Sequence, residues 1–239
     1  MGISFNIKII FLDISLFIKF VKVFRLIRII TMSEDSSIRI GAIAGIASPI
    51  IGIITVLLSI YFSPWFIWQE NALSDLGVEQ AGGTQIAIYL FNIGLIITGS
   101  LIAVFAVLTR SSLPSNRRSK IAYAILFIGG INLALVGIFT ENFPVIHRIV
   151  ALLYFVTTPI SLMIIGSVKI ASDRTFGLFS IGSGAVALVA ILGLVLSIVV
   201  GRAAIPVPEG AAIPEFIEAV ILSVWIGIAG MRVFKTGKI

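Results

Sequence analysis

The chain has 239 residues, of which 59% are hydrophobic and 12% charged, and its formal net charge is +6. Soluble domains contain roughly 45–50% apolar and about 25% charged residues, so this composition excludes a soluble globular enzyme. The absence of cysteine also excludes disulfides, thiolate zinc sites and cysteine nucleophiles.

The first 31 residues alternate large apolar side chains with basic ones. They lack the uninterrupted apolar core and the small-residue cleavage site of a signal peptide. Two interpretations stay open for this N-terminal segment, which we assign to residues 1–38. It is a basic amphipathic helix in the inner membrane interface, or the native chain begins at Met32, whose following residues look like an ordinary cytoplasmic N-terminus.

Six long apolar stretches follow, each bounded by charged residues or by a loop rich in proline and glycine. A helix that crosses a hydrocarbon core of ~30 Å needs about 20 apolar residues, whereas an outer-membrane barrel would alternate at every second residue. We therefore predict an all-α polytopic membrane protein, with a membrane domain over 39–235 and a cytoplasmic tail at 236–239. The six predicted transmembrane helices are Ile40–Phe62, Gln85–Thr109, Ile121–Thr140, Ile149–Val168, Gly177–Val200 and Phe216–Phe234.

Basic residues are distributed unequally between the two sets of connecting loops. One set and the C-terminal tail carry ten of them: Arg39, Arg110, Arg117, Arg118, Lys120, Lys169, Arg174, Arg232, Lys235 and Lys238. The other set carries only Arg148 and Arg202, beside most of the acidic residues. Because basic loops stay cytoplasmic, we expect cytoplasmic termini and an acidic external face in a multi-pass protein of the cell membrane. The basic loops suit anionic lipid headgroups, and no pattern indicates a nucleic-acid partner.

Two predicted helices carry a stripe of small or polar side chains. The third aligns Gly130, Ala134, Gly137 and Glu141, and the fourth aligns His147, Ala151, Tyr154, Thr158 and Ser161. Close helix packing is the simplest interpretation of the glycines. The hydroxyl groups either hydrogen-bond neighbouring helices together or form a polar crevice that descends from the external face, with the only histidine at its mouth.

Ionisable residues in a membrane bundle are costly and often mark function. The candidates, all near the predicted outer interface, are Asp75, Glu141, His147, Glu215 and Glu218. Glu215 follows a proline in the first turn of the last helix, where a carboxylate favours the helix dipole, so we interpret it as a helix-start residue. Glu218 lies one turn deeper and is the stronger functional candidate.

Three groups of residues resemble the prokaryotic membrane-protein family catalogued as domain of unknown function 998. They are Asn71-Ala-Leu-Ser-Asp-Leu-Gly77, Phe91-Asn92 with Gly94 and Gly99, and Gly137-Ile-Phe-Thr-Glu141 with His147. The resemblance covers about Ile40–Phe234, and the same order is more distantly similar to DRAM-type autophagy modulators and Sfk-type membrane proteins. It implies a six-helix layout with shared positions at Ser74, Asp75, Gly77, His147 and Glu218. It also implies an external cluster of Asp75, His147 and Glu218, but no particular biochemistry.

Three classes of function remain. We favour a non-catalytic bundle that binds or organises membrane lipids, in which the polar cluster ties the Ser63–Thr84 loop to the fourth and sixth helices. A membrane-embedded lipid hydrolase or transferase would use Ser74 or a water as nucleophile, His147 as base, and Asp75 or Glu218 to orient it. A transporter of a small solute or ion would use the stripe from His147 to Ser161.

A metal-dependent form of the enzyme would use oxygen and imidazole ligands, a harder set than structural zinc prefers. Its candidate ligands are Asp75, Glu141, His147 and Glu218. The binding candidates are Asn71, Glu141, Tyr154, Thr158 and Ser161. The sequence identifies no cofactor, and an oligomer is compatible with it.

Overall fold

The structure is a computed structural model that describes residues 34–79, 82, 84–200 and 210–239. Nearly all of the predicted N-terminal segment, the choice of Met32 as a start, and Arg202 therefore lie outside the described residues. The chain divides between Ser37 and Ile38. The unit Ile38–Ile239 contains all of the predicted site residues.

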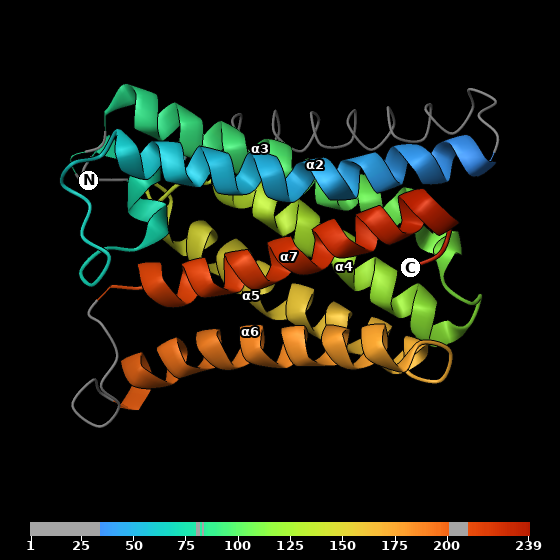
Figure 1. Ribbon diagram of the computed structural model, residues 1–239. Coiled ribbons are helices and arrows are strands. Elements are labelled where there is room, and N and C mark those ends of the chain that lie inside the picture. Colours follow the sequence, from blue (N-terminus) through green and yellow to red (C-terminus); the bar gives the residue numbers. More distant parts are fainter. Residues whose placement is uncertain (1–33, 80–81, 83, 201–209) are drawn as a thin grey trace, which may run out of the picture. The chain divides into compact units, whose positions relative to one another are not determined.

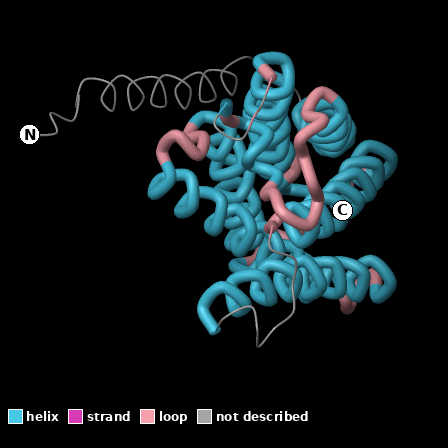
Figure 2. The backbone as a smooth tube through the Cα atoms, turned by 90° about the vertical axis from the view of Figure 1, so that its left-hand side faces the viewer, coloured by secondary structure: helices cyan, strands magenta, loops and turns pink. Residues whose placement is uncertain are grey.

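Six long helices make up the described part of the chain (Figure 1). They are α2 (Glu34–Tyr61), α3 (Gln85–Leu108), α4 (Arg117–Ile138), α5 (Pro144–Lys169), α6 (Arg174–Val200) and α7 (Ala212–Thr236). All six are long and apolar enough to cross a membrane. This confirms the prediction of an all-helical protein with six helices of membrane-spanning length, and Figure 2 shows only helices and loops in the described part.

Side-chain caps explain why α4 and α6 begin before their apolar stretches. Asn116 Oδ1 accepts a 2.9 Å hydrogen bond from Ser119 N, and Asp173 Oδ1 accepts a 3.0 Å bond from Phe176 N. Each cap satisfies an N–H group that has no partner within the helix. The charged first turns at Arg117 and Arg174 are therefore helical, although hydropathy alone leaves them out.

Glycines let α3 pack directly on α4, as the small-residue stripe predicts. A Cβ atom added to Gly99 would lie 2.4 Å from the backbone nitrogen of Ala134, and one added to Gly130 would lie 2.7 Å from that of Ala103. Such short approaches are open only to residues without a side chain. The interpretation of this glycine stripe as a packing surface is confirmed.

Helices α2 and α7 cross at a second glycine contact and separate toward one end of the bundle (Figure 1). At the crossing, a Cβ atom on Gly230 would come within 2.9 Å of the carbonyl carbon of Gly45. We call the end where the helices separate the acidic end, after Asp75, Glu141 and Glu215. The opposite end, which carries Arg110, Arg117 and Arg232, is the basic end.

Candidate functional site

A short 3-10 helix, η1 (Leu73–Gly77), lies at the acidic end and is shaped by two predicted site residues. Asp75 Oδ2 accepts hydrogen bonds from Ala72 N at 2.9 Å and from Asn71 Nδ2 at 3.1 Å. Asn71 Oδ1 in turn accepts one from Ile67 N at 2.8 Å. The side chains of Asn71 and Asp75 therefore form hydrogen bonds within their own loop, as in an Asx turn. These bonds hold η1 in place.

The structure brings three of the predicted site residues together beside η1. Ser74 Oγ donates a 2.5 Å hydrogen bond to Glu141 Oε1, and His147 Nε2 lies 4.0 Å from the same oxygen. His147 Nδ1 lies 2.8 Å from the carbonyl oxygen of Phe139. Because a carbonyl only accepts, Nδ1 carries a proton. We call Ser74, Glu141 and His147 the polar cluster.

Glu215 has a role that its position in the sequence did not indicate. Its Oε2 accepts a 2.8 Å hydrogen bond from the backbone nitrogen of Leu73, so the carboxylate joins α7 to η1. A backbone bond from Ala212 N to the carbonyl of Asn71, 2.9 Å long, reinforces this junction. Sequence reasoning treated Glu215 as a helix-start residue, and its i, i+3 spacing with Glu218 was the only signal available.

Glu218 is fully buried, and neither of its carboxyl oxygens has a hydrogen-bond partner. Among the described residues, no hydrogen bond or ion pair joins His147 to Asp75 or Glu218. The cluster that forms around His147 therefore contains Glu141 and Ser74, while Glu218 lies one turn deeper along α7.

The predicted metal ligands do not gather into one group. Within the part of the chain that the structure describes, no set of three or more histidine, aspartate or glutamate side chains is placed to hold a metal ion. One oxygen of Asp75 is bonded within its loop, and one oxygen of Glu141 is bonded to Ser74. Each carboxylate thus already has a protein partner.

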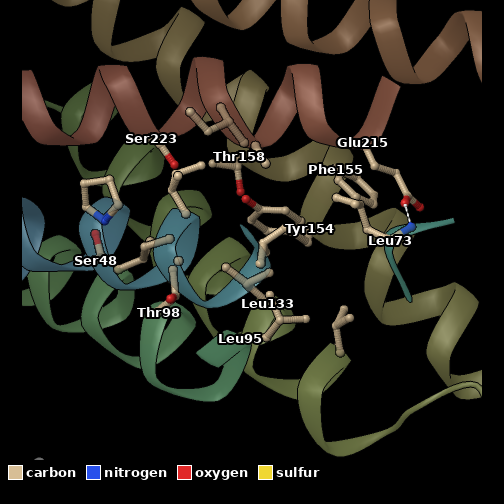
Figure 3. A pocket seen from close by; sticks show the side chains of 18 of the residues that line it. Ser48, Leu73, Leu95, Thr98, Leu133, Tyr154, Phe155, Thr158, Glu215 and Ser223 are labelled. Atoms are coloured by element: carbon tan, nitrogen blue, oxygen red, sulfur yellow. Dashed lines mark hydrogen bonds between the residues drawn. The ribbon is translucent and has the colours of Figure 1, made fainter. Parts of the chain in front are cut away.

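A cavity begins at the polar cluster and runs between α2, α3, α4, α5 and α7 (Figure 3). Its volume, counted as the space open to the centre of a water-sized sphere, is about 100 Å³. Most of the predicted α5 stripe lines this space: His147, Ala151, Tyr154 and Thr158. Ser161 does not, because its hydroxyl donates a 2.8 Å hydrogen bond to the carbonyl of Ala122 and joins α5 to α4.

The walls of this cavity differ in exposure. Most lining residues on α3 to α5, such as Phe91, Leu133 and Leu162, are buried. The lining of α2 and α7 is mixed. Ser48, Val56, Leu222, Trp225 and Ile226 are buried, whereas Pro49, Gly52, Ile53, Glu215, Phe216, Ala219 and Ser223 are half-buried. The less buried part of the lining therefore comes mainly from α2 and α7.

Two hydroxyl groups inside the cavity have no hydrogen-bond partner. Thr98 on α3 and Thr158 on α5 are 7% and 3% exposed, and both line the cavity. Figure 3 shows Tyr154 and Thr158 among the residues that line this cavity. A buried hydroxyl without a partner is unfavourable by about 1–3 kcal/mol, so these groups indicate a polar occupant such as water or a ligand atom. Sequence analysis found Thr158 but not Thr98.

Fold and site together define a helical bundle of the multi-pass membrane type, with an internal cavity beneath a polar cluster. The chain belongs to the family described as protein of unknown function (DUF998), whose model matches residues 46–232. This confirms the resemblance to that family. No curated protein and no solved structure matches the chain. The more distant similarity to DRAM-type and Sfk-type proteins stays a prediction, as does a prokaryotic origin.

Proposed function

We propose that this protein is a non-catalytic membrane protein that binds a lipid, with the lipid head at the polar cluster and its chain in the cavity. The observation that carries the proposal is the continuity of the site. His147 and Ser74 line the same cavity as Leu95, Leu126 and Leu162. A space with charged and polar groups at one end and mostly apolar walls along the rest matches an amphiphile.

The dimensions and the side opening support a chain-like ligand. Along α5, the lining runs from His147 to Leu162, a rise of ~22 Å at 1.5 Å per residue. One water needs ~10–15 Å³ of such space, so about 100 Å³ spread over this length suits a narrow chain. The half-buried lining residues on α2 and α7 allow the ligand to enter sideways from the bilayer.

The proposed orientation places the acidic end outside a cell membrane and both termini in the cytoplasm. Basic residues cluster at the opposite end, among them Arg110, Arg117 and Arg232. An excess of Lys and Arg marks cytoplasmic loops. The bound lipid would then come from the outer leaflet.

Native mass spectrometry of the protein, purified in a neutral detergent, tests lipid binding. The variant Ala151→Phe places a ring in the cavity, because Ala151 lines it. The neighbouring Leu152 is 49% exposed and does not line the cavity, so Leu152→Phe is the matched control. We expect wild type and Leu152→Phe to retain lipid and Ala151→Phe to lose it. Equal lipid content in all three proteins would contradict the proposal.

The bond between Ser74 and Glu141 favours a second candidate, a lipid hydrolase. A carboxylate 2.5 Å from a hydroxyl oxygen is placed to take the proton of an attacking serine. Turnover of a fluorogenic lipid ester by the purified protein is the test. In this case Ser74→Ala and Glu141→Gln would both abolish turnover while leaving the lipid content unchanged. Absence of turnover in the wild type would exclude this candidate.

A further inference from the structure

We propose that the lipid bound in this cavity carries a primary ammonium head group, which the acidic end of the cavity recognises. The inference rests on the proposed lipid-binding function and names the chemical class of its ligand. It follows from two observations, which are the supply of hydrogen-bond acceptors at the cavity mouth and the sign of the charge around it.

The cavity mouth offers acceptors and has its donors in use. The Ser74 hydroxyl donates to Glu141, and the backbone N–H of Leu73 donates to Glu215. The Nδ1 proton of His147 is directed toward the Phe139 carbonyl. The carboxylates of Glu141 and Glu215 have further lone pairs. An ammonium group supplies three donors and no acceptor, which complements this arrangement.

The charge at the cavity mouth also favours a cationic ligand. Glu215 lines the cavity, and no lysine or arginine appears among its described lining residues. Glu218, fully buried and without a hydrogen-bond partner, lies one turn deeper on the same helix. Arg148, the basic residue next to His147, is exposed and does not line the cavity. A cation at the mouth would stabilise the ionised form of the Glu215 carboxyl group, because opposite charges attract strongly where water is scarce.

A phosphate head group fits the same residues poorly. It needs several donors, usually Arg, Lys or free backbone N–H groups, and the Ser74 hydroxyl and the Leu73 N–H are already paired. It would also lie against Glu215 and near Glu141, and like charges repel at this range. The unpartnered hydroxyls of Thr98 and Thr158 lie deeper in the cavity and are independent evidence for an occupant with polar atoms.

Three amphiphiles with the same dodecyl tail and different head groups test whether the protein recognises the head group or only the tail. Dodecylamine, dodecyl phosphate and dodecanol are titrated into wild-type protein in a neutral detergent at pH 7, and binding is read by native mass spectrometry and thermal shift. We expect dodecylamine to bind at least about tenfold more tightly than the other two. Equal binding of all three, or preference for the phosphate, would overturn the ammonium proposal and leave lipid binding standing. No binding of any of them, together with no retained native lipid, would overturn both.

Variants that replace one glutamate with neutral glutamine test which carboxyl group recognises the ammonium head group. Glu215→Gln keeps an acceptor for Leu73 but removes the negative charge that lines the cavity, and we expect it to reduce the preference for dodecylamine about tenfold. Glu218→Gln should reduce the preference less, because Glu218 does not line the cavity. Glu70→Gln makes the same charge change at an exposed loop position and should leave the preference unchanged. An equal loss in Glu70→Gln and Glu215→Gln would contradict recognition at the cavity mouth.

Discussion

The carboxylate of Glu215 accepts a hydrogen bond from the backbone nitrogen of Leu73, 142 residues earlier in the chain. This bond connects η1 to the first turn of α7 across the mouth of the cavity. Leu73 is itself buried, with 7% of its surface exposed. The position of η1 therefore depends partly on this carboxylate, together with the backbone bond from Ala212 N to the carbonyl of Asn71.

Replacing Glu215 with alanine should lower the free energy of unfolding by about 1–3 kcal/mol, because the N–H of Leu73 loses its acceptor in a buried place. Thermal or denaturant unfolding in a neutral detergent measures the change. The control is Glu70→Ala, which removes an exposed acid from the same loop and should stay within about 0.5 kcal/mol of wild type. A loss no larger than that of the control would contradict the structural role of this bond.

The close contact between α3 and α4 predicts strong intolerance at Gly99. An alanine there would place Cβ 2.4 Å from the backbone nitrogen of Ala134, and backbone cannot move aside as a flexible side chain can. We expect Gly99→Ala to destabilise the protein by about 1–3 kcal/mol or more. Gly182→Ala on α6 is the control, since nothing lies within 4 Å of its added Cβ, and it should be neutral or stabilising by up to about 1 kcal/mol. Similar unfolding temperatures for the two variants would refute the packing argument.

Features that depend on one helix at a time could be read from the sequence. Apolar length predicted six long helices, and the spacing of Gly130 and Gly137 predicted a packing surface, because both depend only on helical periodicity. The shared face of His147, Tyr154 and Thr158 follows from the same periodicity. All three line the cavity.

Features that depend on how helices meet could not be read in this way. The bond between Glu215 and Leu73 requires a loop to dock onto a distant helix, and no local pattern encodes that docking. The cavity is lined by side chains of α2, α3, α4, α5 and α7. Its size therefore depends on how helices far apart in sequence pack against one another. Periodicity placed Ser161 with the cavity stripe, but Ser161 bonds to Ala122 on α4 instead.

At the basic end, the hydrogen bonds of Asp173 lead us to expect that the folded protein loses stability at acidic pH. The N–H of Phe176, and to a smaller extent the guanidinium of Arg232, lower the pKa of Asp173 from its ordinary value of 3.8. A carboxyl with a lowered folded-state pKa stabilises the fold above its unfolded pKa, and this contribution disappears as the pH falls through the folded value. Asp173→Asn should therefore be slightly less stable than wild type at neutral pH. The difference should shrink as the pH falls below about 3.8 and vanish below the lowered pKa of Asp173.

Unfolding temperatures of wild type and Asp173→Asn, measured from pH 2 to pH 7, test this expectation. Asparagine keeps an oxygen to cap α6, so the comparison isolates the charge. Added salt should reduce the difference at neutral pH, because the pair with Arg232 is partly exposed and exposed charges are screened. A difference that is independent of pH would indicate that the cap alone stabilises this end.

The proposed orientation can be tested by cysteine labelling, because the chain contains no cysteine of its own. Glu70 and Ser115 are exposed loop residues at the acidic and basic ends, and each is replaced by cysteine in turn. With a membrane-impermeant maleimide on intact cells, we expect Glu70→Cys to react and Ser115→Cys to react only after permeabilisation. The distribution of basic residues is the physical reason, since Lys and Arg in short loops resist translocation. The reverse pattern would place the polar cluster in the cytoplasm, and the ligand would then come from the inner leaflet.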